Sequence, residues 1–269
     1  MRPNRSRSAR LLASVAILTT IAAGLAGCQT NQTAETTGSL AAVPANRSDA
    51  DLHRDVEAYG AKYRADPSNV DVALHYAQVL RASGQRAQAV AVLEQVSMQH
   101  PGNKAVLGEY GRALADNGNY DQALEVLDRA HTADQPDWRV LSAQGAVLDQ
   151  MGRHQEAQRH YLTALKIVPD EPSVLSNLGL SYALSKDLKK AEETLRQAAA
   201  QHPADPRVRQ NLALVIGLQG RFAEAEEIAR ADLPPDQAAA NVAYLRQMLA
   251  RNSQASPHGA AKTARAGSS

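Results

Sequence analysis

Residues 84 to 89 read GQRAQA, and the same pairing of a glycine with an alanine five residues later recurs along the chain. The four glycines of this series follow one another at intervals of 34, 34 and twice 34 residues. Lys186 stands halfway along the double interval, where a further glycine would complete the series. Prolines recur at intervals of 34, 35, 33 and 34. This period indicates a stacked array of similar supersecondary units. The markers are Gly84, Gly118, Gly152 and Gly220; Ala89, Ala123, Ala157, Ala191 and Ala225; and Pro67, Pro101, Pro136, Pro169 and Pro203.

Each unit has the pattern of two helices joined by a tight turn. In the first unit, apolar residues recur at helical spacing before Gly84, which is suited to a positive φ just past a helix end. A second helix is expected from near Gln85, and Pro101 prevents its continuation. Each unit is therefore predicted to be a helical hairpin. The apolar positions are Val70, Ala73, Ala77 and Leu80 in the first helix, and Ala89, Val92, Leu93 and Val96 in the second.

Small residues also recur at one position in each expected first helix. Together with the 34-residue period, the alanine series and the closing prolines, they resemble the tetratricopeptide repeat (TPR) family. The resemblance implies an all-α fold, a superhelix of helical hairpins with about five repeats plus flanking capping helices. The small residues are Ala77, Gly111, Gly145, Gly179 and Ala213, and the repeats begin near Val70, Lys104, Trp138, Pro172 and Pro206.

The ends of the array depart from the repeat pattern. The fourth unit has Lys186 in place of glycine, and the fifth has Asp232 where a small apolar residue is usual and ends early at Pro234 and Pro235. Helices are expected over residues 51–64 and 238–251, where they would cover the exposed edges of the terminal repeats. The predicted TPR domain spans residues 51–251.

Composition argues against an enzyme, a metal site or a nucleic-acid-binding protein. The formal net charge is +1, the eight histidines are scattered, and the motifs of nucleophile elbows, zinc peptidases and nucleotide-binding loops are not found. A single cysteine, Cys28, leaves no second thiol for a disulfide or a zinc site. We expect no cofactor, and we keep an enzyme with an inconspicuous site as a minor alternative.

The N-terminus has the features of an export signal. Residues 1–10 carry four arginines and no acid, and an apolar stretch of 17 residues follows. Leu25-Ala26-Gly27-Cys28 resembles the bacterial lipobox, which implies that residues 1–27 are removed and that Cys28 carries the lipid. The alternative is an uncleaved N-terminal anchor. Cleavage would change the formal net charge from +1 to −3.

The segments on either side of the array are polar. Residues 28–50 are predicted to be a disordered tether carrying the acylated Cys28, and residues 252–269 a disordered tail. Gln29 follows the cysteine where aspartate would resemble the inner-membrane retention signal of many lipoproteins. We therefore expect a lipid-anchored protein of the bacterial outer membrane, facing the periplasm.

The TPR resemblance also implies a peptide-binding groove lined by the first helices. Asn177 and Asn211, one repeat apart, are suited to bonding the backbone of a bound peptide; the alternative is that such residues are only solvated. The Lys and Asn clamp with which some TPR domains hold a C-terminal carboxylate is missing at the matching positions. The expected groove residues are Leu74, Gln78, Arg81, Arg112, Arg139, Asn177, Leu180, Arg207, Asn211 and Leu214.

The architecture as a whole is similar to that of lipoproteins that assist the assembly of tight-adherence (Flp) pili. That resemblance implies a non-enzymatic protein whose partner is a peptide segment of a secretin or another pilus component. The alternative is an envelope scaffold for peptidoglycan enzymes or for outer-membrane protein insertion. In either case the partner is a protein, with no nucleic acid, and the membrane contact is the lipid on Cys28.

Overall fold

The computed structural model describes residues 48–201 and 205–255, so the predicted signal peptide, Cys28 and most of the tether and tail lie outside the described residues. Within these two ranges the regular elements are helices, apart from one isolated bridge between Thr132 and Gln135. The described chain divides into two compact units, residues 48–211 and 212–255, and α11 crosses this division. The helices are α2 (Asp49–Ala65), α3 (Val70–Ala82), α4 (Arg86–Gln99), α5 (Lys104–Asp116), α6 (Tyr120–Arg129), α7 (Trp138–Gln150), α8 (His154–Ile167), α9 (Pro172–Leu184), α10 (Leu188–Gln201), α11 (Pro206–Leu218), α12 (Phe222–Ala229) and α13 (Pro235–Ala255).

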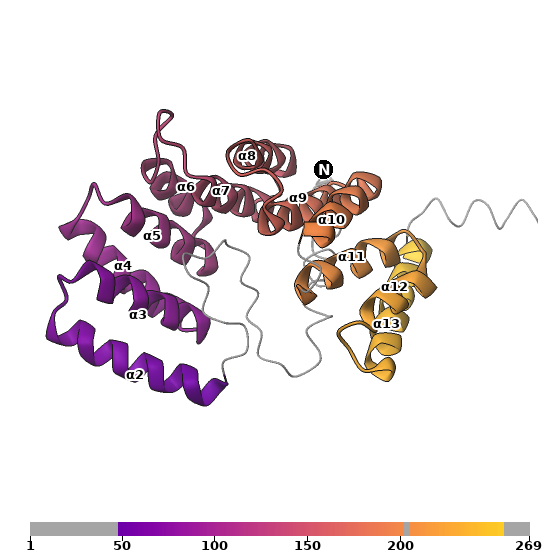
Figure 1. Ribbon diagram of the computed structural model, residues 1–269, viewed down its shortest axis with the longest axis horizontal. Helices are drawn as coiled ribbons and strands as arrows, with labels where there is room; N and C mark the ends of the chain where they lie inside the picture. The colour runs from indigo at the N-terminus through magenta and orange to yellow at the C-terminus, as the bar shows by residue number, and fades with distance from the viewer. Residues whose placement is uncertain (1–47, 202–204, 256–269) are drawn as a thin grey trace, which may run out of the picture. The chain divides into compact units, whose positions relative to one another are not determined.

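The unit of residues 48–211 is a stack of helical hairpins (Figure 1). The hairpins are α3 with α4, α5 with α6, α7 with α8, and α9 with α10, and each packs on the next. The first helices of neighbouring hairpins also contact one another, α3 with α5, α5 with α7, and α7 with α9. Helix α2 packs on α3, as expected of a helix that covers the N-terminal edge. The fold is the predicted all-α array.

Small residues on the first helices let the second helices approach closely. A Cβ on Gly111, Gly145 or Gly179 would lie only 2.5 to 2.7 Å from a carbon of Leu127, Tyr161 or Leu195. These three large side chains are fully buried, so each hairpin places a bulky residue directly over a glycine. The small-residue series therefore follows from the distance between the two helices.

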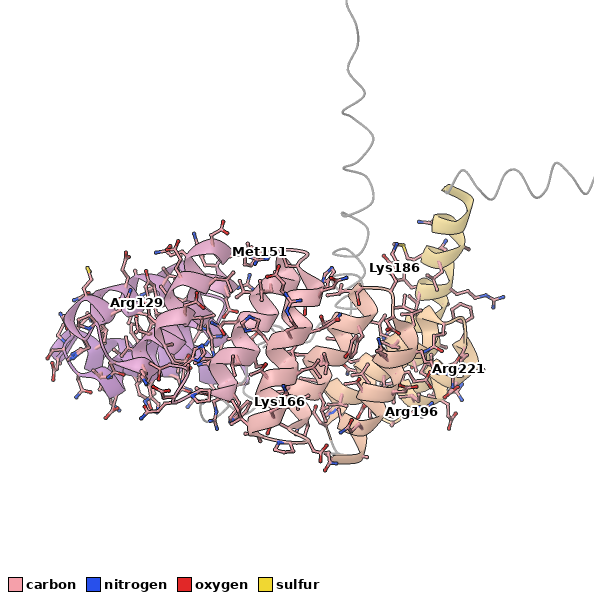
Figure 2. All side chains as sticks on the ribbon, turned by 90° about the horizontal axis from the view of Figure 1, so that it is seen from above. Arg129, Met151, Lys166, Lys186, Arg196 and Arg221 are labelled. Carbon is pink, nitrogen blue, oxygen red and sulfur yellow. The ribbon has the colours of Figure 1, made fainter. Side chains whose placement is uncertain are left out.

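The turn inside each hairpin requires a left-handed residue after the first helix. Gly84, Gly118, Gly152 and Gly220 have φ between 75° and 85°, and Lys186 in the vacant position has φ of 68°. The turn around Lys186 also repeats the hydrogen bonds of the glycine turns, with Asp187 N donating to Tyr182 O as Gln85 N donates to Leu80 O. Figure 2 shows Lys186 and Met151, the residue that follows α7, along one edge of the hairpin stack.

We expect Lys186→Gly to raise the free energy of unfolding by about 0.5 to 1 kcal/mol. A left-handed conformation costs a residue with a Cβ about 1 to 2 kcal/mol, part of which is offset by the greater freedom of glycine in the unfolded chain. Urea denaturation followed by circular dichroism measures the change. Lys189→Gly, inside α10, is the control and should be destabilising; a loss of stability in both variants would contradict the account.

The ends of the array differ slightly from the predicted boundaries. Helix α2 begins at Asp49 because Ser48 caps it: its hydroxyl accepts from Asp51 N, while the Asp51 carboxylate accepts from Ser48 N. Helix α13 continues to Ala255, four residues into the predicted tail, since no helix breaker precedes Pro257. No helix in the described part of the chain is long and apolar enough to cross a membrane.

The unit of residues 212–255 is small, and its core mixes alanine with larger aliphatic side chains. Helix α12 has only 8 residues, which agrees with the early end of the fifth repeat in the sequence. Val215 and Ile216 of α11 are fully buried, and Ala213, Ala229 and Ala238 form a buried cluster with Ile228 and Leu233 packed against it. A Cβ on Gly217 would lie 2.5 Å from Leu245 of α13, so α13 covers α11 here as a second helix would.

Candidate protein-binding face

The predicted groove residues lie on the first helices, as the repeat pattern requires. We call the members of this set that lie in the unit of residues 48–211 the first-helix face. Most of them are partly exposed, and Arg207 is open to solvent; the remaining predicted residue, Leu214, belongs to the other unit. The members are Leu74, Gln78 and Arg81 on α3, Arg112 on α5, Arg139 on α7, Asn177 and Leu180 on α9, and Arg207 and Asn211 on α11.

Arg112 is not the exposed contact that the sequence suggested. Its side chain is only 2% exposed, because the carboxylate of Glu109, one turn earlier on α5, holds its guanidinium within the packed layer. Arg112 Nη1 donates to Glu109 Oε1 over 2.7 Å. Burial lowers the pKa of Arg112, and the charge of Glu109 opposes that effect.

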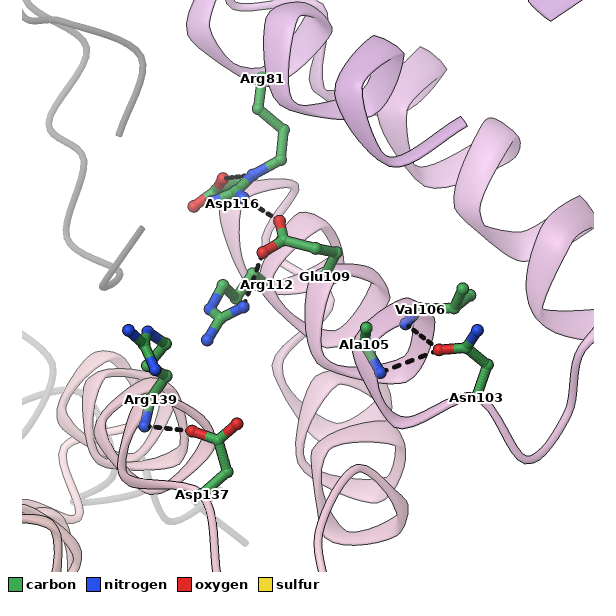
Figure 3. Close-up of polar contacts among 9 residues, drawn as sticks. All are labelled: Arg81, Asn103, Ala105, Val106, Glu109, Arg112, Asp116, Asp137 and Arg139. Carbon is green, nitrogen blue, oxygen red and sulfur yellow. Dashed lines mark hydrogen bonds and ion pairs between the residues drawn. The ribbon is translucent and has the colours of Figure 1, made fainter. Parts of the chain in front are cut away.

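An ion-pair network joins this buried pair to α3 (Figure 3). Arg81 Nη1 lies 3.0 Å from the second oxygen of Glu109, and Arg81 Nε lies 2.6 Å from Asp116 Oδ2. Glu109 thus bridges two guanidinium groups and is itself 2% exposed. The network ties α3 to α5 across the two repeats. Sequence spacing did not reveal it, because Arg81 is 28 residues from Glu109 and 35 residues from Asp116.

Arg139 stands at the first turn of α7. Its backbone N–H donates to the carboxylate of Asp137, which caps the helix. Its guanidinium lies over the ring of Trp138, 4.4 Å from the ring centroid. Trp138 itself packs against the cluster of Leu141, Leu148 and their neighbours, so the stacked arginine has a fixed platform.

The two asparagines are anchored to the preceding repeat. Asn177 Nδ2 lies 3.4 Å from Ser142 Oγ, and Asn211 Nδ2 donates to Ser176 Oγ over 2.9 Å. Both pairs are 35 residues apart, and both serines are buried. The serines were not among the predicted residues; their regular offset from the asparagines is the signal that could have identified them.

A second polar cluster lies between α7, α8 and α9. The carboxylate of Asp149 accepts from Ser181 Oγ over 2.8 Å and from Tyr161 OH over 3.2 Å, and His154 Nδ1 lies 2.8 Å from it. Burial raises the pKa of Asp149, and the hydrogen bonds of His154 and Ser181 oppose that effect. These contacts join two repeats, and no motif in the sequence marks them.

The described residues contain no group of three or more His, Cys, Asp or Glu side chains placed to hold a metal ion.

His160 on α8 makes stability depend on pH. Burial lowers its pKa, partly opposed by the charge of Asp128, while His131 and Arg159 lower the pKa further. The unfolded chain then takes up a proton at a higher pH than the folded chain, so stability falls as the pH drops from neutral through the ordinary histidine pKa. We expect His160→Gln to lose less stability than the wild type between neutral and mildly acidic pH, as measured by urea denaturation. An unchanged pH dependence would contradict this assignment.

Comparison with known proteins identifies the repeat. Family models described as tetratricopeptide repeat match residues 80–147, 138–201 and 206–231, which together span more than half of the chain. The chain is therefore an all-α tetratricopeptide-repeat protein, a class whose repeats act as scaffolds for protein–protein interaction. None of the matching family models is that of an enzyme. A search of curated proteins finds no match.

Several solved structures share the fold at low sequence identity. PilW, described as a widely conserved type IV pilus biogenesis factor, is 16% identical with a TM-score of 0.62, over 72% of this chain and 91% of PilW. A tetratricopeptide repeat protein from Parabacteroides merdae is 15% identical with a TM-score of 0.54, over 74% of this chain and 87% of that one. A chain of the APC/C hetero-tetramer Cut9–Hcn1 is 19% identical with a TM-score of 0.57, over 71% of this chain and 39% of that one.

Proposed function

We propose that this protein is a lipid-anchored, non-enzymatic component of the bacterial cell envelope that helps to assemble tight-adherence (Flp) pili. One observation carries the proposal: Leu25-Ala26-Gly27-Cys28, a polar segment and a TPR array follow one another on a single chain. In this order of parts the protein resembles the tight-adherence pilus assembly protein TadD. PilW, described as a pilus biogenesis factor, has a similar fold, so such an array serves pilus biogenesis in at least one other protein.

The proposed mechanism combines anchoring with weak capture. Acyl chains on Cys28, at about 0.8 kcal/mol per buried CH₂, hold the chain on the outer membrane. A flexible segment of the length of residues 28–50 reaches about 25 Å, which lets the array work near the bilayer surface. The first-helix face holds a peptide segment of the secretin subunit, with Asn177 and Asn211 bonding its backbone. Confinement at one membrane raises the effective concentration of both partners, so a weak contact suffices.

The variant Cys28→Ala tests the anchor and its purpose together. In cells labelled with palmitate, the wild type should incorporate label and remain with the outer membrane, whereas Cys28→Ala should do neither. Secretin multimers and pili should also decrease in the variant strain. Thr30→Ala, just outside the lipobox-like residues, is the matched control and should behave as the wild type.

Two results would contradict the proposal in different ways. Equal palmitate incorporation by the wild type and Cys28→Ala would remove the lipid anchor. Normal secretin multimers in a strain that lacks the protein would remove the role in pilus assembly, and cell-wall defects in that strain would favour an envelope scaffold for peptidoglycan enzymes instead.

A further inference from the structure

Two guanidinium groups of the first-helix face have buried nitrogens without a hydrogen-bond partner. Among the residues that the structure describes, the Nε atoms of Arg112 and Arg139 are both inaccessible to solvent and unpaired. A buried donor without an acceptor is costly, and more so when it belongs to a charged group. The hydrogen-bonding capacity of both guanidinium groups is therefore not filled within the described chain, and of the two residues only Arg139 is partly exposed.

The two groups belong to one seam between α5 and α7. A Cβ on Gly108 of α5 would lie 3.7 Å both from Arg112 Nη1 and from Val140 Cγ2, and Val140 is the residue next to Arg139. The guanidinium of Arg112 thus lies on the side of α5 that faces the first turn of α7. Figure 3 shows the Arg112 side chain leaving α5 toward the first turn of α7, where Arg139 and Asp137 lie.

The ion pairs around this seam leave out one guanidinium, that of Arg139. Arg81 and Arg112 are paired with two carboxylates, Glu109 and Asp116. The third carboxylate, Asp137, is exposed; its Oδ1 accepts the backbone N–H of Arg139, and its charge acts on Arg112. The Arg139 guanidinium has no ion pair with the described acids, and its stacking on Trp138 leaves its edge for a planar acceptor.

We infer that Arg139, backed by the buried charge of Arg112, binds the side-chain carboxylate of an aspartate or glutamate in the captured peptide. This inference rests on the proposed function, because it names the chemistry of the segment that the first-helix face holds. A carboxylate matches the fork of donors on a guanidinium and makes charge-assisted hydrogen bonds. Arg139 is the binding residue. Arg112, whose guanidinium is held by Glu109, contributes only its buried positive charge. The partner segment is therefore acidic.

Selection from a random peptide library tests this without knowledge of the partner. Phage-displayed dodecapeptides would be selected on the purified full-length protein as wild type, Arg139→Gln and Arg159→Gln. Arg159 is an exposed arginine on the second helix α8, so its variant changes the charge equally without touching the face. The wild type and Arg159→Gln should enrich Asp or Glu several-fold at one register, and Arg139→Gln should not.

Fluorescence anisotropy with a selected peptide gives the matching affinity readout. Changing its acidic residue to the amide should weaken binding to the wild type about tenfold, as expected for a charge-assisted hydrogen bond, and binding to Arg139→Gln less than twofold. Arg139→Lys should retain part of the discrimination. Circular dichroism of each variant shows whether the fold is kept.

Three outcomes would overturn the inference. They are peptides selected by the wild type without acidic enrichment, the same enrichment on Arg139→Gln, and no selected peptides at all. In the first two cases the protein still binds peptides, so the proposed function stands while the acidic site fails. In the third case, the proposed function is decided separately by the Cys28→Ala strain and by crosslinking in cells.

Discussion

Replacing Glu109 by glutamine should lower the free energy of unfolding by about 3 to 5 kcal/mol, the range found when one partner of a buried ion pair is removed. The variant leaves the guanidinium of Arg112, 2% exposed, without its counter-charge. It also removes one of the two carboxylates that hold Arg81. Urea denaturation of the full chain, followed by far-UV circular dichroism, measures the loss.

Two further variants test whether this loss of stability comes from leaving a buried charge without its partner. Asp116→Asn breaks the more exposed end of the same network and should cost about 1 kcal/mol or less. The double variant Glu109→Met with Arg112→Met removes both charges together and should be close to neutral, because apolar residues of similar volume often replace buried ion pairs without loss. A Glu109→Gln variant no less stable than Asp116→Asn would contradict the account.

The close packing of the fourth hairpin gives the second large effect. Leu195→Ala should lower the free energy of unfolding by about 2 to 5 kcal/mol, because it empties a fully buried site. Gly179→Ala should lower it by about 1 to 3 kcal/mol, since its new Cβ would lie 2.6 Å from Leu195 Cγ. In the double variant Gly179→Ala with Leu195→Ala, the new methyl group occupies space that the leucine vacated. Its total loss of unfolding free energy should therefore be well below the sum of the two single losses.

Gly108→Ala is the matched control for this cycle. Gly108 is also inside a first helix, but a Cβ there would make only ordinary contacts of 3.7 Å. The change should therefore stabilise the protein by up to about 1 kcal/mol through helix propensity. Additive losses in the double variant, or equal effects of the two glycine changes, would show that the glycine series does not report helix contact.

The fold could be predicted in detail because each repeat carries its geometric constraints in single residues. A left-handed turn after the first helix selects glycine, and the close crossing of two helices selects glycine or alanine opposite a bulky residue. Lys186 was identified as standing in the glycine position, and its φ of 68° confirms that the turn is kept. The sequence did not predict the bounds of the two terminal helices: Ser48 caps α2 at an earlier start, and α13 continues to Ala255.

The candidate site could be predicted only in part. Repeat register placed its residues on the first helices, because the position of a residue in the repeat fixes its helix face. It did not show that Glu109 draws Arg112 into the interior, since the contact depends on side-chain paths and on Arg81 from another repeat. The unpaired Nε of Arg139 is invisible in the sequence for the same reason. The lipid on Cys28 lies outside the described residues and remains a prediction.

The central claim, that the first-helix face captures a secretin segment at the membrane, is tested most directly by photocrosslinking in living cells. A photoreactive amino acid would replace either Leu180 on the first-helix face or Leu162, an exposed leucine on the second helix α8. The account predicts a crosslinked adduct with the secretin subunit from position 180 and little or none from position 162. Equal adducts from both positions, or an adduct from position 180 that contains no pilus component, would contradict it.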